Sequence, residues 1–196
     1  MHTPQHGTWL FCTPEQLITG QDTSWQTMAL AGTRIPCTLP WDAKNKREQT
    51  LVTEFIRETL NPLADTLSES PLENLRAGRI EHLCTRFNFT MPPGRIIQLL
   101  DKLPPTPAVC GAPVDAARKL LQQHPDIERS CYAGYLGPWG KGGVQFYVSL
   151  RCMQIFRGFC RLYAGGGLMP DSVEEQEWQE TENKMACMRQ AIRNAY

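Results

Sequence analysis

The stretch A-G-G-G-L-M-P-D-S-V-E-E-Q-E-W-Q-E-T-E-N-K, residues 164–184, joins a short apolar run to a long predicted helix. Consecutive glycines let a backbone approach a ligand closely and offer N–H groups to an anion, but a flexible turn has the same composition. Glu177, Glu180 and Lys184 follow at spacings of three and four, so they share one stripe of the helix. Glu180 and Lys184 are also in the favourable order for an ion pair one turn apart. The stretch therefore indicates either a ligand cradle or a solvated, ion-paired helix face.

The same helix carries an apolar stripe that we expect to pack on the rest of the domain. Its members recur at spacings of three and four: Trp178, Thr181, Met185, Met188 and Ile192. The acidic stripe lies about 100° from it around the helix, at the edge of the predicted buried face.

The remaining sequence alternates short β-like runs with amphipathic segments. We expect strands at 8–11, 16–18, 25–31, 79–89, 131–136, 144–151 and 159–164, with a hairpin turn at 139–143. We expect helices at 44–67, 92–103, 114–124 and 172–195, and a stiff loop at 105–113. This order predicts an α+β fold with a mostly antiparallel sheet and packed helices.

Composition excludes several classes of partner. The chain has 196 residues, with 20 Lys plus Arg against 20 Asp plus Glu. That length suits one domain, residues 1–196, and the balanced charge gives no reason to expect nucleic acid or a membrane surface as a partner. No apolar run approaches the roughly 20 residues of a membrane span, and the first residues do not read as a signal peptide. Eight cysteines without a CxxC pair predict buried free thiols in a reducing cytoplasm.

Motifs along almost the whole chain resemble those of the chorismate-binding enzymes, which include isochorismate, anthranilate, aminodeoxychorismate and salicylate synthases. Beside the glycine and glutamate stretch, they are C-T-P-E (12–15), L-A-G-T-R (30–34), K-R-E-Q-T-L-V (46–52), H-L-C-T (82–85), P-T-P-A-V-C-G-A-P (105–113), E-R-S-C-Y-A-G (128–134) and L-R-C (150–152). Their order and spacing both match. The resemblance implies the C-terminal portion of that family's layered α/β sandwich.

The resemblance is greatest to isochorismate synthases, in which water attacks C2 of chorismate as the C4 hydroxyl leaves. The anthranilate-type D-L-x-R-N-D motif is absent, and Ala108 stands where salicylate synthases have threonine. The product would feed menaquinone or siderophore biosynthesis. A salicylate synthase, a chorismate-binding module without catalysis, and a protein whose last helix is merely solvated remain the alternatives.

The resemblance implies the roles of the catalytic and metal-binding residues. Glu15 matches the general acid that protonates the leaving hydroxyl, a role that needs a raised pKa; otherwise it is a turn residue after proline. His82 matches a histidine near that hydroxyl, although a lone histidine in a strand is more often a core residue. Glu48 and Glu180 match two Mg²⁺ ligands, with Glu177 in the second ring of acids.

The resemblance also implies how the substrate is bound. Arg151 and Tyr132 match the residues that hold the pyruvyl carboxylate, with a backbone N–H from Gly165. The ring carboxylate would lie near Gly32 and Thr33, with Lys184 beside it. Ala108 falls within a matching substrate-binding motif.

The sequence departs from the family in one major respect. The lysine that serves as general base lies well upstream of T-P-E in the family, and no residue here aligns with it. We therefore expect a chain truncated at its N-terminus, without the first strands of the sandwich; an active and an inactive fragment both remain open. Lys44, Lys46, Lys102, Lys119 and Lys141 fall in other motifs. A sheet cut in mid-domain exposes an edge, so we also expect a homo-oligomer formed through that edge.

Overall fold

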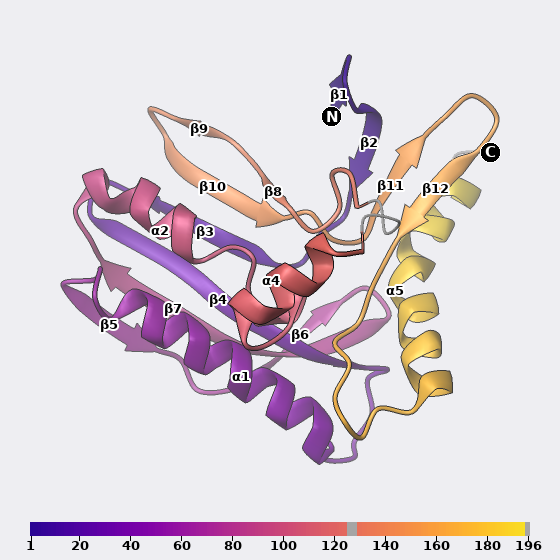
Figure 1. Ribbon diagram of the computed structural model, residues 1–196, viewed down its shortest axis with the longest axis horizontal. Coiled ribbons are helices and arrows are strands. Elements are labelled where there is room, and N and C mark those ends of the chain that lie inside the picture. The colour runs from indigo at the N-terminus through magenta and orange to yellow at the C-terminus, as the bar shows by residue number, and fades with distance from the viewer. Residues whose placement is uncertain (125–128, 195–196) are drawn as a thin grey trace.

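The computed structural model describes residues 1–124 and 129–194 and confirms the α+β class with antiparallel sheets. An eight-stranded sheet has the order β5-β7-β4-β3-β10-β8, with β6 also paired to β7 and β9 to β10 (Figure 1). Its strands are β3 (Gln16–Gln21), β4 (Ser24–Arg34), β5 (Thr66–Glu69), β6 (Glu73–Ala77), β7 (Ile80–Thr90), β8 (Tyr135–Leu136), β9 (Trp139–Gly140) and β10 (Gly143–Val148).

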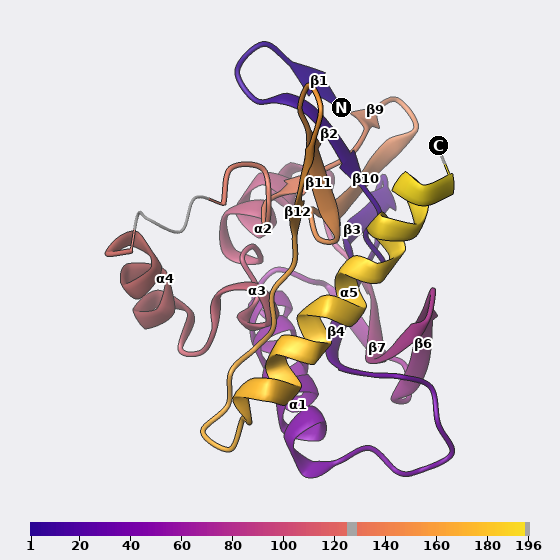
Figure 2. The same ribbon diagram turned by 90° about the vertical axis from the view of Figure 1, so that its right-hand side faces the viewer.

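A second, four-stranded sheet has the order β1-β2-β11-β12, with strands β1 (His2–Thr3), β2 (Gly7–Phe11), β11 (Cys152–Ile155) and β12 (Cys160–Tyr163). The helices are α1 (Ala43–Leu60), α2 (Ile96–Lys102) after the 3₁₀ turn η1 (Pro93–Arg95), α3 (Pro107–Cys110), α4 (Val114–Gln122) and α5 (Glu174–Asn194). Figure 2 shows α5 crossing one side of the molecule, with α4 at the periphery.

The main core lies between the large sheet and the helices α1 and α2. Ile56 and Leu60 of α1 meet Phe87 of β7 and Leu99 of α2, all fully buried. Successive residues of β4 face opposite sides of the sheet, so Ala29 joins this core. Its neighbours Met28 and Leu30 form a small second cluster with Cys84 on the other face.

The chain crosses between the two sheets twice, and the two crossings are hydrogen-bonded together. The first crossing follows β2 and the second precedes β11. Cys12 N–H donates to the Arg151 carbonyl at 3.1 Å, and Val148 N–H donates to the Glu15 carbonyl at 3.0 Å. These bonds place Glu15 and Arg151, which are 136 positions apart, on neighbouring segments.

Several expected boundaries are wrong. The first long helix ends at Leu60 and not at residue 67, because the chain turns there into β5. Residues 131–134 form a turn, so only β8 remains of the strand expected at 131–136, and β10 stops at Val148. The expected loop 105–113 contains the single-turn helix α3. Strands β5, β6 and β11 were not expected, and the end expected for the last helix, residue 195, lies outside the described residues.

The predicted orientation of the last helix is correct only in part. Met188, a member of the expected apolar stripe, is 1% exposed, and Thr181, Met185 and Ile192 are half-buried. Trp178 is 63% exposed, however, and Glu177 is only 8% exposed. The buried face is therefore turned toward the acidic stripe, because Glu177 has an ammonium partner inside.

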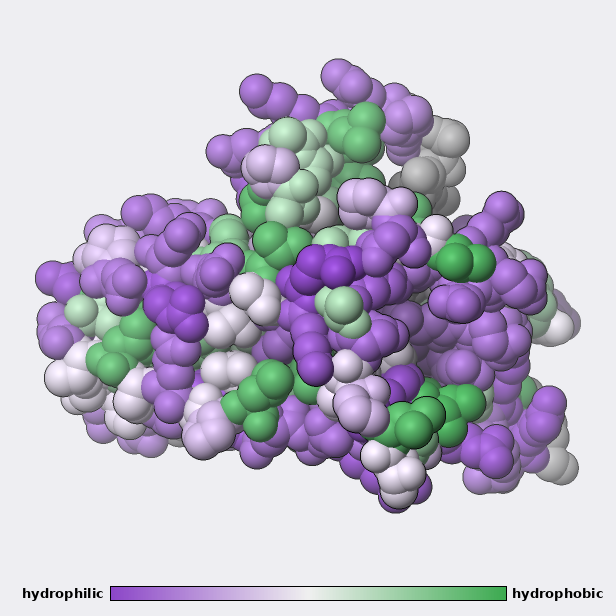
Figure 3. All heavy atoms as spheres, turned by 90° about the horizontal axis from the view of Figure 1, so that it is seen from below, coloured by the Kyte–Doolittle hydropathy of each residue, from purple (hydrophilic) through white to green (hydrophobic). Residues whose placement is uncertain are grey.

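The surface fits the expected balance of charge. Hydrophilic side chains cover most of the face seen from below, and apolar ones form small separate groups (Figure 3). Within the described residues, no helix is long and apolar enough to cross a membrane.

All eight cysteines are free, but only Cys84 and Cys152 are buried, while Cys12 and Cys37 are exposed, so the expected burial holds for a minority.

Candidate active site

Glu15 is a buried carboxyl group at the first crossing between the sheets. Only 3% of the residue is exposed. Burial raises its pKa to about 8, although the charges of Lys184 and Arg151 act in the opposite direction. Burial disfavours a carboxylate more strongly than these two cations favour it. Glu15 is therefore mainly protonated at neutral pH, which is the form that a proton donor needs.

His82 of β7 is held as a neutral imidazole. Its Nδ1 lies 2.8 Å from the Gly32 carbonyl oxygen and its Nε2 contacts the Arg151 guanidinium. A carbonyl can only accept and a guanidinium can only donate, so the proton lies on Nδ1 and Nε2 accepts. Burial and the charge of Arg151 lower the pKa of His82 to about 3. His82 thus lies between the bulge at Gly32 and Thr33, which its Nδ1 contacts, and Arg151, which its Nε2 contacts.

A β-bulge in β4 presents Gly32 and Thr33. The pairing of β4 with β7 is interrupted between Ala31 and Arg34, and Gly32 has φ +68°. A methyl group at Gly32 would lie 3.1 Å from the Asn45 side chain, so that side chain would have to move. The Asn45 Oδ1 accepts the Thr33 N–H at 2.9 Å. Asn45 thus fixes the bulge to α1.

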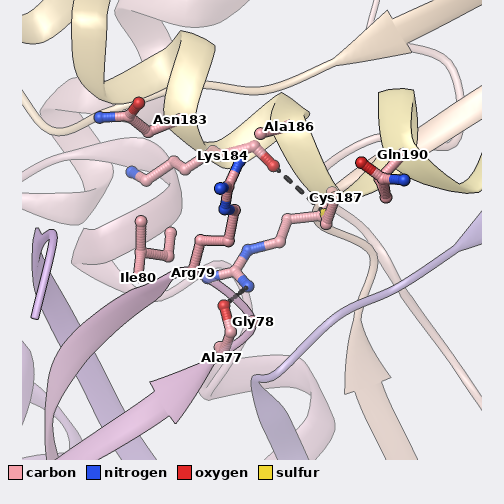
Figure 4. Close-up of a pocket in the computed structure, with 10 residues that line it drawn as sticks. Ala77, Gly78, Arg79, Ile80, Asn183, Lys184, Ala186, Cys187 and Gln190 are labelled. Carbon is pink, nitrogen blue, oxygen red and sulfur yellow. Dashed lines mark hydrogen bonds between the residues drawn. The ribbon is translucent and has the colours of Figure 1, made fainter.

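Arg151 and Lys184 line one cavity of about 370 Å³ between the β6–β7 turn and α5. Figure 4 shows Arg79 from the turn and Lys184, Cys187 and Gln190 from α5 around this space. Arg151 is 7% exposed, has φ +44°, and donates to the Ala77 carbonyl at 3.2 Å. A positive φ in a residue other than glycine is costly and concentrates at functional positions.

Tyr132 faces the glycine segment that precedes α5. A methyl group at Gly165 would lie 2.8 Å from the Tyr132 hydroxyl, and the Gly165 carbonyl accepts from Lys184 Nζ at 3.0 Å. Burial raises the pKa of Tyr132 to about 12, so its hydroxyl remains a donor. Tyr132 and Gly165 therefore meet, as the resemblance implied, and Lys184, expected near Gly32 and Thr33, bonds to Gly165 as well. The Arg151 guanidinium, expected beside Tyr132, is directed toward His82 and Ala77.

Three glutamates converge on the same glycine segment. A methyl group at Gly166 would lie 3.4 Å from Glu177 Oε2 and 3.5 Å from Glu180 Oε1, and one at Gly167 would lie 3.8 Å from Glu48 Oε1. The Glu180–Lys184 ion pair forms at 2.6 Å, so the ion pair and the cradle anticipated for this stretch are both present. Residues far apart in the sequence thus form one cluster of carboxylates.

Lys44, which the sequence reasoning set aside, belongs to this cluster. Its Nζ lies 3.3 Å from Glu48 Oε1 and forms an ion pair with Glu177. Burial lowers the pKa of Lys44, but its hydrogen bond to Glu177 and the charge of Glu48 outweigh burial and raise it. The lysine one turn before Glu48 was the available signal, because residues four apart share a helix face.

The cluster consists of carboxylates, the ligand type that hard divalent cations prefer. Glu177 Oε2 is buried without a hydrogen-bond partner, and Glu48 Oε1 has only the 3.3 Å ion pair with Lys44. Burial raises the pKa of Glu48, and the charge of Glu180 adds to the rise while Lys44 opposes it. In the described part of the chain, no three His, Cys, Asp or Glu side chains stand in a ready arrangement for a metal ion. Glu48, Glu177 and Glu180 are the residues that could hold Mg²⁺ here.

Two further residues differ from expectation. Ala108 lies in α3, half-buried against the main core, and none of the described contacts joins it to the residues above. Gln49 is a residue that sequence reasoning missed: its Oε1 accepts the Ala31 N–H at 2.9 Å and its Nε2 reaches the Ala29 carbonyl at 3.2 Å. Gln49 thus links α1 to β4 through hydrogen bonds beside the bulge.

A buried neutral acid, three cations at a cavity and a group of carboxylates thus lie on one antiparallel α+β scaffold. The profile of the family described as chorismate binding enzyme matches residues 2–193. The chain belongs to this family.

Relatives of known name are isochorismate synthases. The chain is 36% identical over 187 residues to isochorismate synthase MenF of Escherichia coli, covering 90% of this chain and 43% of that protein. It is 36% identical over 198 residues to the salicylate biosynthesis isochorismate synthase of Pseudomonas aeruginosa, covering 93% and 41%. The chain thus spans less than half the length of these two relatives.

Solved structures agree with the sequence comparison. The menaquinone-specific isochorismate synthase MenF from Escherichia coli superimposes with a TM-score of 0.82 at 35% identity, covering 92% of this chain and 45% of that one. DhbC from Bacillus anthracis, described as a putative 2,3-dihydroxybenzoate-specific isochorismate synthase, gives 0.86 at 27% identity, covering 98% and 56%. The layered sandwich inferred from the motifs is therefore the observed fold.

Proposed function

We propose that this protein binds chorismate and carries the acid half of a Mg²⁺-dependent isochorismate synthase site. The observation that carries the proposal is the buried, protonated Glu15 beside Arg151 and Lys184. Dehydroxylation at C4 needs a proton donor that is neutral at pH 7, and burial supplies it. Conversion of chorismate to isochorismate would supply the menaquinone, 2,3-dihydroxybenzoate or salicylate routes for which the relatives are named.

The substrate is a dianion, and the site offers two regions for its two carboxylates. Arg151 at the cavity suits the pyruvyl carboxylate, with Tyr132 and the Gly165 N–H alongside. The bulge at Gly32 and Thr33 would hold the ring carboxylate near Lys184. His82, neutral and accepting from Arg151, would orient the guanidinium without adding charge of its own.

Glu48, Glu177 and Glu180 would hold Mg²⁺ against the ring carboxylate. The ion, when bound, would neutralise that carboxylate and orient it. The chain's own contribution would be the glycine segment, whose backbone at Gly166 and Gly167 lies close to all three carboxylates.

The hydration half of the reaction needs a base that removes a proton from water. Of the lysines that the structure describes at this site, Lys184 is paired with Glu180 and Lys44 with Glu48 and Glu177. Both are engaged by carboxylates and neither corresponds to the family's base. This observation favours a second candidate function, a chorismate-binding domain that does not complete the reaction alone.

Incubation with chorismate and Mg²⁺, followed by chromatography, separates these functions. Isochorismate formation that is lost in Glu15→Gln and kept in Glu54→Gln, a change on the exposed face of α1, supports the complete activity. Chorismate binding without product supports the binding domain. Salicylate as the main product would transfer the chain to another branch of the family, and absence of both binding and product would refute the proposal.

A further inference from the structure

The Lys44 ammonium lies among three carboxylates, one of which, Glu177, also accepts from the Ser172 hydroxyl at 2.6 Å. The ammonium contacts Glu48 and Glu177, while Lys184 serves Glu180. Three carboxylates thus share two ammonium groups. The side chain of Glu177 is 10% exposed, and its Oε2 still lacks a hydrogen-bond partner while facing Gly166. The cluster therefore retains an unpartnered oxygen and net negative charge even with Lys44 in place.

The place of Lys44 on its own helix is unfavourable for a cation. It lies in the first turn of α1, two residues after the N-cap Asp42, where the helix dipole disfavours a positive charge. The first turn of α1 contains no acidic residue, the opposite of the usual preference. The contact with Glu48, one turn along α1, and the contact with Glu177 of α5 compensate for this position. Lys44 is thus held by two carboxylates of the cluster, one from each helix.

We propose that Lys44 is a built-in competitor for the divalent cation, an ammonium that holds the three glutamates together and leaves the cluster when the ion enters. The inference rests on the proposed Mg²⁺ site. An ammonium on a flexible four-carbon stem is suited to this exchange, because it can move to solvent with little backbone change. The neighbouring residues Ala43 and Lys46 are exposed, so solvent lies beside the first turn of α1.

Displacement has two consequences. Cation affinity is lowered in the wild type, because the ion must replace an existing ion pair and not simply fill an empty site. The cluster is also protected from collapse or repulsion in the absence of the ion, because like charges at close range destabilise one another. Removing the ammonium should therefore tighten cation binding and weaken the metal-free fold.

The test is calorimetric titration of Mg²⁺ into the wild type, Lys44→Met, Lys44→Arg and Lys46→Met, repeated with Mn²⁺. Lys46 lies on the same helix and is exposed, so its substitution removes the same charge outside the cluster. We expect Lys44→Met to bind either ion at least about tenfold more tightly, since a unit charge a few ångströms away is removed from a partly buried site. Lys44→Arg and Lys46→Met should remain within about twofold of the wild type.

A second readout does not depend on affinity. In the presence of a chelator, Lys44→Met should unfold at a lower temperature than the wild type. Saturating Mg²⁺ should raise the unfolding temperature of Lys44→Met by more than it raises that of the wild type. Equal Mg²⁺ affinity in Lys44→Met and the wild type, or weaker affinity in Lys44→Met, overturns the inference.

Glu180→Gln distinguishes that failure from failure of the site itself. If Glu180→Gln weakens Mg²⁺ binding while Lys44→Met does not change it, the proposed metal site is supported and the proposed role of Lys44 is refuted. If Glu180→Gln has no effect, or if no variant binds either ion, the proposed metal site falls and the inference falls with it.

Discussion

The buried carboxyl of Glu15 makes the stability of the protein depend on pH in a calculable way. Its pKa is about 8 in the folded protein against 4.5 for the ordinary group. Between these values the folded state holds a proton that the unfolded state has lost, so stability falls as pH rises. Linkage gives a loss of about 3.5 kcal/mol between pH 5 and pH 8 from this one group. That is a large share of the roughly 5–15 kcal/mol that stabilises a typical domain.

The variant Glu15→Gln isolates this effect, because an amide resembles the protonated carboxyl and cannot ionise. Urea unfolding of wild type and variant at pH 5 and pH 8 measures the free energy of unfolding of each. We expect similar values at pH 5 and a variant that is more stable by about 3–4 kcal/mol at pH 8. The exposed Glu54→Gln serves as the control. The difference between its free energy of unfolding and that of the wild type should be the same at pH 5 and pH 8. A wild-type to Glu15→Gln difference that stays the same within about 1 kcal/mol at both pH values would refute the raised pKa.

Three further predictions concern the site and the assembly. Gly165→Ala should weaken chorismate binding about tenfold, because the added methyl would meet the Tyr132 hydroxyl at 2.8 Å, whereas Gly142→Ala, with nothing within 4 Å, should not; equal affinities in a titration would contradict this. Nitrogen NMR of the imidazole should show His82 neutral with Nδ1 protonated from pH 9 down to about 4, since its pKa is about 3, and protonation near pH 6.5 would exclude the described contact with Arg151. Light scattering at micromolar concentration should show a homo-oligomer formed through a sheet edge, and a sharp monomer would remove that expectation.

The strands and helices with strong periodicity were predictable from the sequence. α1, β4 and β7 all appear near their expected positions, because each buries one face in the main core. Short strands such as β6 and β11 were missed, since their pairing with distant strands, not their own composition, makes them strands. In the last helix, the burial of Met188 was predicted, but Trp178 was expected inside in place of Glu177, because spacing alone cannot tell that Glu177 has an ammonium partner.

The residues of the site also divide into those that the sequence could group and those that only the fold brings together. Glu177, Glu180 and Lys184 could be grouped from helix spacing, and the structure places them together. Glu15 and Arg151 could not be joined by any local rule, because two sheet crossings and their backbone hydrogen bonds bring them together. Lys44 was set aside because it was considered only as a base. Its place in the carboxylate cluster is seen only in the folded structure, where Glu48 of α1 and Glu177 of α5 both contact its ammonium.

Calorimetric titration of chorismate into the protein, with and without Mg²⁺, tests the central claim most directly. The account predicts binding that strengthens with Mg²⁺ and that is lost in Arg151→Met, because the buried guanidinium is the main cation at the cavity. Absence of binding under both conditions, or binding that neither Mg²⁺ nor Arg151 affects, would contradict it.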